Sequence, residues 1–230
     1  GGPIIPTSYA VRSDTVEAIG REIRRTTFHS TNSASINIVD QRNHTVSLDV
    51  PYPPPLHHRP TDVVHLWDLD DSRNYGHLRK AVSQELQSMV GMHVNGRPVT
   101  IQVGIQGERY TTGRNSVQSD YIHALISSKI VVVAQRDSWE DHYRLMEALA
   151  SGAMVLHDRM LSLPHGLQNG TSVVLFEHLG QLKRLIGHYL QNDEERLSIA
   201  MRGWEIAMGR HRSWHRIEEV FFGCPLTDTF

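Results

Sequence analysis

From Thr61 onward the sequence alternates short apolar runs with amphipathic segments, and few folds accommodate that alternation. Its clearest apolar run, residues 129–134, is rich in β-branched side chains and suits a strand that is buried on both faces. Strands separated by helices imply an α/β fold with a doubly wound, mostly parallel sheet of the Rossmann-like type. Ligands of such sheets bind beyond the carboxyl ends of the strands, where the strand order reverses.

Apolar spacing and turn residues set the expected elements of this domain. Strands are expected at residues 63–67, 99–103, 129–134, 153–156 and 173–176. Helices are expected at residues 75–90, 120–127, 142–151, 179–191, 194–208 and 214–221. Together they would make one complete α/β domain.

Residues 1–60 differ from the rest because they are rich in Ser, Thr, Asn and Pro. They hold a helical pattern at 14–25, a short strand pattern at 35–39 and a proline run that favours an extended spacer. We therefore expect a domain boundary near residue 60. The predicted organisation is the tail of an N-terminal domain with a Pro-rich linker at 1–60, the Rossmann-like domain at 61–222 and a C-terminal tail at 223–230.

The composition argues against several classes of protein. A formal net charge of -2 gives no sign of a basic face, so no nucleic-acid partner is expected. A single cysteine, Cys224, excludes an internal disulfide and a cysteine-rich zinc site. No apolar run approaches the roughly 20 residues that a membrane-spanning helix needs.

One segment, residues 128–158, combines the parts of a ligand site: strand, polar loop, helix, glycine and second strand. The helix would direct its partly positive N-terminus to the carboxyl edge of the sheet, which suits a diphosphate. On this helix Arg144 and Glu147 are three residues apart and share one face. Arg suits forked recognition of phosphate and a carboxylate accepts ribose hydroxyls, whereas the simpler interpretation is an ion pair on a solvated helix.

The run from Arg144 to Val155 resembles the donor-site signature of glycosyltransferases with two Rossmann-like domains, the GT-B type: Arg-x-x-Glu-Ala-x-x-x-Gly, a small residue and a strand. The resemblance is especially to exostosin-like and spore-protein-type, family 1-like enzymes. It covers residues 61–222 and is strongest over 128–211. It implies the C-terminal, donor-binding half of such an enzyme, with Glu147 on the donor ribose and Arg144 on the diphosphate. Gly152 would let the backbone approach the ligand, end the helix, or both.

Four more residues near this segment are candidates for donor binding: Lys129, Trp139, Glu140 and His142. His142 opens the predicted helix, where it could donate to phosphate oxygens. Many retaining members of the family carry two glutamates with seven residues between them. Here Glu140 and Glu147 have six between them and Trp139 occupies the earlier register, so retention and inversion both stay open.

The resemblance implies an enzyme that transfers a sugar from a nucleotide-diphosphate donor to a glycan or glycoprotein acceptor. Arg144 would stabilise charge on the leaving diphosphate, so no cofactor and no obligatory metal is expected. Any catalytic base is expected from an N-terminal domain of the same chain, without which this half would bind donor and catalyse nothing. By the same resemblance, the expected location is the Golgi or another secretory membrane.

Two other functions fit parts of the sequence. Asp68 and Asp70 follow the first strand and look like the nucleophile loop of a Mg²⁺-dependent, haloacid-dehalogenase-like phosphatase, or like the metal motif of GT-A glycosyltransferases. Against the phosphatase, no later acidic pair at a strand end completes a metal site, and short acidic loops after strands are frequently helix N-caps. The other alternative is a non-catalytic nucleotide-binding α/β domain.

Overall fold

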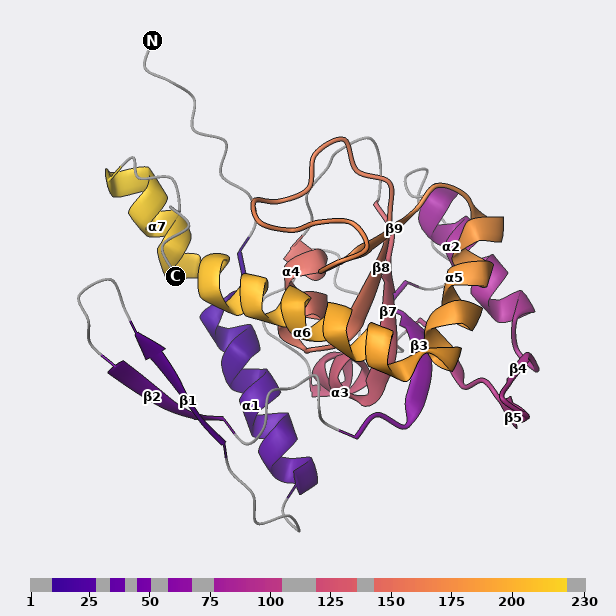
Figure 1. Cartoon of the computed structure of the whole chain (residues 1–230), viewed down its shortest axis with the longest axis horizontal. Helices are drawn as coiled ribbons and strands as arrows, with labels where there is room; N and C mark the ends of the chain where they lie inside the picture. The colour runs from indigo at the N-terminus through magenta and orange to yellow at the C-terminus, as the bar shows by residue number, and fades with distance from the viewer. Residues whose placement is uncertain are drawn as a thin grey trace.

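The computed structural model describes residues 10–27, 34–39, 45–50, 58–67, 77–104, 119–135 and 143–222. A five-stranded sheet lies at its centre (Figure 1). The strands are β3 (Thr61–His65), β6 (Ile101–Val103), β7 (Ser128–Val133), β8 (Met154–Asp158) and β9 (Val174–Phe176). Every neighbouring pair is parallel, which confirms the predicted α/β, Rossmann-like fold.

The strand order in the sheet is β6-β3-β7-β8-β9. The chain passes from β3 to β6 on one side and then returns to β7 on the other side of β3. The order therefore reverses between β3 and β7, and a crevice beyond the carboxyl ends of these two strands is the expected ligand site.

Helices cover both faces of the sheet because side chains of each strand alternate between two cores. One core joins Val64, Val131 and Val133 to helices α1 (Ser13–Thr27), α3 (Ser119–Ser127) and α4 (Tyr143–Ala150). The other joins Val63 and Val132 to α2 (His77–Ser88) and α5 (Leu179–Gln191). Helix α6 (Asp193–Arg210) contributes Ile199 to the second core and Ile206 to the first, so it runs along both.

Helix α1 belongs to the same packed body as the sheet. Its residues Ala18, Ile19 and Ile23 are buried in the core that also holds Ile122 and Leu125 of α3. Figure 1 shows α1 beside α3 on one side of the sheet. The predicted helix at 14–25 is therefore present and packs on the Rossmann-like domain, while the domain boundary near residue 60 stays a prediction.

Two small hairpins were not predicted as pairs. Strand β1 (Ala34–Val39) matches the predicted strand, and its antiparallel partner β2 (Thr45–Val50) was missed. Strands β4 (His93–Val94) and β5 (Arg97–Pro98) are joined by Asn95 and Gly96, which both have positive φ angles, 53° and 75°. An Asn-Gly pair with that geometry is the favoured two-residue hairpin turn, so the sequence held the signal.

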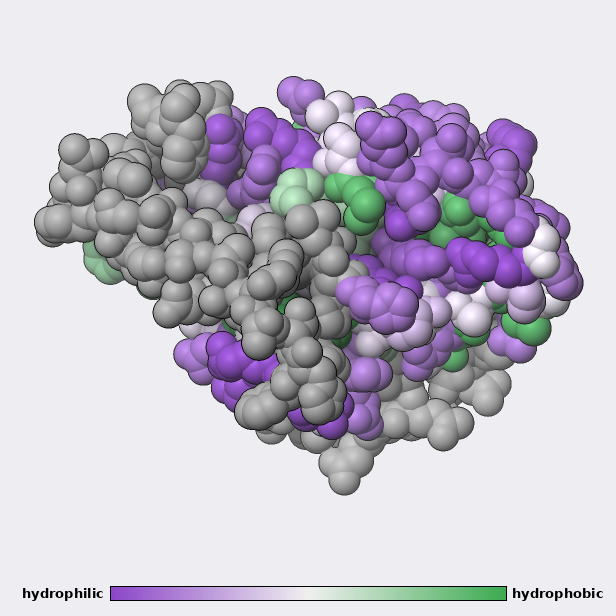
Figure 2. Space-filling model, turned by 60° about the horizontal axis from the view of Figure 1, so that its bottom comes forward, coloured by the Kyte–Doolittle hydropathy of each residue, from purple (hydrophilic) through white to green (hydrophobic). Residues whose placement is uncertain are grey.

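The last helix, α7 (Ser213–Phe222), leaves several large apolar side chains exposed, among them Ile217, Val220 and Phe221. Elsewhere the described surface in Figure 2 is mostly hydrophilic, with apolar side chains confined to small areas. Among the helices of the described residues, none combines the length and apolar character needed to cross a bilayer.

Candidate functional site

The carboxyl ends of β3, β7 and β8 are tied together by polar contacts. Gln135 follows β7, and its backbone N–H donates to Asp158 Oδ1 at 2.9 Å at the end of β8. Burial raises the pKa of the Asp158 carboxyl, although the neighbouring His157 opposes that shift. Trp67 follows β3 and therefore lies at the point where the strand order reverses. Its side chain is 7% exposed.

Two guanidinium groups lie against the Trp67 ring. The Cζ atom of Arg79, from α2, is 4.3 Å from the ring centroid, and that of Arg144, from α4, is 4.8 Å away. Both distances are within the range of cation–π attraction. The Nε atom of Arg79 also donates to the carbonyl of Ala134 at 2.9 Å, just past β7. Helices α2 and α4, on opposite faces of the sheet, thus each place one cation at the same edge.

His65 lies next to Trp67, with the two ring centroids 4.9 Å apart, and is fully buried. Its Nδ1 atom is 2.8 Å from the carbonyl oxygen of Val132, to which it donates in the tautomer protonated at Nδ1. Burial, together with the charges of Arg79 and Arg144, lowers the pKa of His65 to about 4. The imidazole is therefore neutral at pH 7, and the positive charge at this edge comes from the guanidinium groups.

Glu147 lies one helical turn after Arg144 and is only 2% exposed. Its Oε2 atom accepts from the hydroxyl of Tyr121 in α3 at 2.5 Å, and its Oε1 atom accepts from the hydroxyl of Thr15 in α1 at 3.3 Å. The Tyr121 ring also faces Arg144, whose Cζ atom is 5.5 Å from the ring centroid. Arg144 itself is half-buried. The structure therefore brings Arg144 and Glu147 together and places neither on a solvated outer face.

Gly152 and Lys129 lie at the opposite, amino edge of the sheet. Gly152 has φ 77° and its N–H donates to the carbonyl of Leu149 at 3.0 Å, so it ends α4 just before β8 begins. Lys129 stands near the start of β7, where its Nζ atom lies 2.8 Å from Asp62 Oδ1. Of the predicted group, these two residues are not brought to the edge that carries Arg144. A strand places its first and last side chains at opposite edges, which explains the difference for Lys129.

At the amino edge, Asp62 pairs with two cationic side chains. It is buried, and its carboxylate accepts from both Arg97 and Lys129. Although burial opposes ionisation, the hydrogen bonds from Arg97 and Lys129 lower the pKa of Asp62 to about 2. This cluster joins β3, β5 and β7.

Several predicted residues fall outside the described ranges, namely Asp68, Asp70, Trp139, Glu140 and His142. Their predicted roles are therefore untested. Among the residues that the structure does describe, no group of three His, Cys, Asp or Glu side chains is placed to hold a metal ion.

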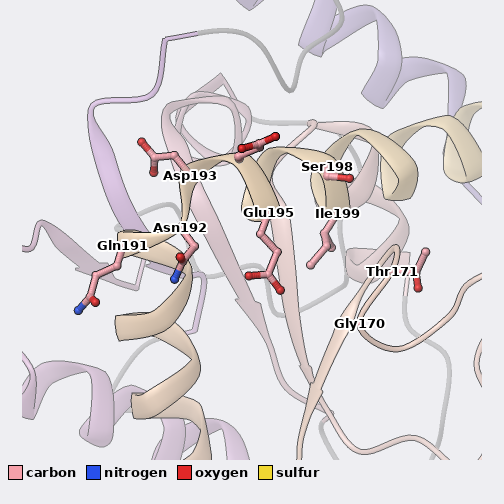
Figure 3. A pocket seen from close by; sticks show the side chains of 9 residues that line it. Gly170, Thr171, Gln191, Asn192, Asp193, Glu195, Ser198 and Ile199 are labelled. Atoms are coloured by element: carbon pink, nitrogen blue, oxygen red, sulfur yellow. The ribbon is translucent and has the colours of Figure 1, made fainter.

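A hollow of about 660 Å³ opens at the amino edge, between the junction of α5 and α6 and the loop before β9 (Figure 3). Its lining includes Asp193, Glu194 and Glu195 of the first turn of α6, together with Gly170 and Thr171. The three carboxylates would repel a diphosphate. This hollow is therefore a poor candidate for an anionic ligand and is separate from the carboxyl edge.

A model of the family described as glycosyl transferase-like matches residues 82–221, more than half of the chain. The chain belongs to this family. No curated protein matches it. The glycosyl transferase-like match, with the parallel sheet, confirms the predicted GT-B glycosyltransferase domain. It includes Tyr121, Arg144 and Glu147, whereas Trp67 and Arg79 precede its first matched residue.

Four residues of this candidate site were not predicted from the sequence: Thr15, Trp67, Arg79 and Tyr121. Trp67 carried a signal, because it is the last residue of an apolar run that ends at the ligand-binding edge. Arg79 and Tyr121 lie among the apolar positions of predicted helices. A polar group that is buried at such a position usually has a hydrogen-bond partner, and this was the signal. Thr15 carried none, because its partner is 132 residues away in the chain.

Proposed function

We propose that this chain binds a nucleoside-diphosphate sugar at the carboxyl edge of its sheet and transfers the sugar to a glycan or glycoprotein acceptor. The observation that carries the proposal is the pair of guanidinium groups, Arg79 and Arg144, on the Trp67 ring where the strand order reverses. An anion is the ligand that such a pair favours, and a diphosphate matches the place in the fold.

The two arginines would play different parts. Arg79 is 6% exposed and donates to the main chain, so it sets a fixed positive potential. Arg144 is half-buried on the first turn of α4, where it is able to meet a ligand. Charge builds on the diphosphate as the bond to the sugar breaks, and a guanidinium held in a partly desolvated site stabilises that charge. The proposal therefore requires no metal ion.

The remaining parts of the proposal come from the resemblance. A catalytic base, if the enzyme inverts, would be supplied by an N-terminal domain of the same chain, and the protein would work in the Golgi or another secretory membrane. Binding of the donor ribose by Glu147 stays a prediction, because that carboxylate is 2% exposed and lies under Thr15 and Tyr121.

Isothermal titration calorimetry tests the proposal with pyrophosphate, UDP and GDP, each with and without EDTA. The expected result is binding of pyrophosphate and of at least one nucleotide, unchanged by EDTA and lost in Arg144→Ala. Arg202→Ala is the matched control, because Arg202 is exposed on α6 and pairs with Glu205. Equal affinity of the wild type and Arg144→Ala, or no binding of any of these ligands, would overturn the proposal.

A further inference from the structure

Tyr121 lies between the two residues of the predicted donor pair. Its hydroxyl donates to Glu147 Oε2 at 2.5 Å, while its ring centroid is 5.5 Å from the Cζ atom of Arg144. The Trp67 ring faces the same guanidinium at 4.8 Å. The centroid of the Tyr143 ring is 5.6 Å from the same Cζ atom. Arg144 is thus held against three aromatic rings, and one of them, Tyr121, donates a hydrogen bond to the carboxylate of Glu147.

A ligand hydroxyl has little access to that carboxylate. Glu147 is 2% exposed, and the Thr15 side chain that covers Oε1 is fully buried. Thr15 belongs to α1, which is anchored in the core by Ile19 and Ile23. A ribose hydroxyl that bound this carboxylate would therefore have to displace the hydroxyl of Thr15 or of Tyr121.

We infer that Glu147 is a positioning residue: it holds the Tyr121 ring, and that ring together with Trp67 orients Arg144 for the diphosphate. The inference rests on the proposed function, since it takes Arg144 as the group that meets the donor. It departs from the role that the resemblance gives to Glu147, which is direct contact with the ribose.

The physical advantage of this arrangement is preorganisation. A free arginine side chain has many rotamers, and a ligand that immobilises it loses part of the binding free energy as entropy. A guanidinium held against three rings has lost much of that freedom before the ligand arrives. Removing the Tyr121–Glu147 hydrogen bond takes away the polar restraint on the Tyr121 ring and thereby weakens the hold on Arg144.

A comparison of pyrophosphate with UDP or GDP separates the two roles, because pyrophosphate has no ribose. Glu147→Leu removes the acceptor of the Tyr121–Glu147 hydrogen bond, and Tyr121→Phe removes its donor. In both variants, positioning predicts that the affinities for pyrophosphate and for the nucleotide fall by the same factor, roughly tenfold. The double variant should lose no more than either single variant, because both changes break the same contact. Loss of nucleotide affinity with unchanged pyrophosphate affinity in Glu147→Leu would overturn the inference in favour of direct ribose binding.

A ligand-free measurement keeps the inference distinct from the proposed function. The Nε–H proton of Arg144, assigned by its absence in Arg144→Ala, should show an upfield ring-current shift in the NMR spectrum of the wild type. That shift should shrink in Tyr121→Phe and Glu147→Leu and persist in Glu22→Leu, a matched control at another buried glutamate between α1 and α3. An unchanged shift in Glu147→Leu overturns the inference, whereas a lost shift without any pyrophosphate binding refutes only the proposed function.

Discussion

Thr15 and Glu147 are 132 residues apart in the chain, yet the hydroxyl of Thr15 donates to Glu147 Oε1 at 3.3 Å. Both residues are buried, so the Thr15 hydroxyl satisfies a carboxylate oxygen in a place where water has little access. The contact ties the N-terminal helix α1 to the helix that carries the proposed donor site.

Thr15→Val should therefore destabilise the fold, because it removes a donor from a buried carboxylate while keeping the volume of the side chain. We expect a loss of about 1–2 kcal/mol in the free energy of unfolding. Urea denaturation measures it, with Thr171→Val as the control, because Thr171 is exposed in the loop before β9. A loss no larger than that of the control would mean that the Thr15 contact contributes nothing to stability.

The close approach of α6 to α4 and to the loop before β9 depends on Gly203. A Cβ atom at this position would lie 2.4 Å from the carbonyl oxygen of Ser172 and 2.8 Å from Leu149 Cδ2. A main-chain carbonyl cannot move aside easily, so Gly203→Ala should destabilise the protein by about 2–3 kcal/mol. The same α6 offers the control, because a Cβ atom at Gly209 would meet nothing within 4 Å.

Gly209→Ala should raise the free energy of unfolding by a few tenths of a kcal/mol up to about 1 kcal/mol, because alanine favours a helix interior. Thermal or urea unfolding of the two variants measures both the expected loss of stability in Gly203→Ala and the expected gain in Gly209→Ala. If both substitutions shifted stability in the same direction, the steric explanation for Gly203 would be wrong.

Asp62 predicts a loss of stability in acid. Its pKa in the folded protein is about 2, below the ordinary value of 3.8, because hydrogen bonds from Arg97 and Lys129 outweigh the cost of burial. A carboxyl with a lowered folded pKa stabilises the protein above its unfolded pKa, and that contribution disappears as the pH falls from about 4 to about 2. Asp62 is fully buried, so the contribution amounts to about 2 kcal/mol.

Asp62→Asn should accordingly cost stability at pH 7 and little at pH 2. Urea denaturation of both proteins across this range measures the difference, and Asp120→Asn at the exposed start of α3 is the control. A cost that did not depend on pH would show that Asp62 acts through its shape and not through its charge.

From the lowered pKa of His65 we expect a second loss of stability, at higher pH than that of Asp62. Its folded pKa is about 4 against an ordinary 6.5, because burial and then the charges of Arg79 and Arg144 disfavour the imidazolium ion. Below pH 6.5 the unfolded chain binds a proton that the folded protein refuses, so stability should fall between about pH 6.5 and pH 4. In an NMR titration, the His65 ring signals should stay constant from pH 8 to pH 5, whereas a midpoint near 6.5 would contradict the buried, cation-flanked site.

The fold was largely predictable from the sequence, and the reasons are local. Each predicted element in the described residues is present within two residues of its expected ends, because apolar runs such as 129–134 have few alternatives to a buried strand. The reversal between β3 and β7 was not predictable, since it depends on long-range pairing. Asn95 and Gly96 show a local signal that was simply not used.

The candidate site was predictable only in part. Arg144 and Glu147 share one short helix, so their proximity follows from helical spacing alone. The cover over Glu147 comes from α1, on the far side of the expected boundary at residue 60, and no periodicity links Thr15 to that helix. For Lys129 the sequence already held the answer. Its position near the start of a predicted strand places it at the amino edge, away from Arg144.

Trp67 allows the cation site to be tested without touching a charge. Trp67→Leu removes the aromatic face that both guanidinium groups use, whereas Trp67→Phe keeps a smaller one. Under the proposed function, pyrophosphate affinity should fall roughly tenfold in Trp67→Leu and less in Trp67→Phe, because a cation–π contact in a partly desolvated site is worth about 1–2 kcal/mol. Calorimetry measures the affinities, and unfolding curves check that both variants fold. Equal affinities in the two variants would show that pyrophosphate binding does not depend on an aromatic face at this position.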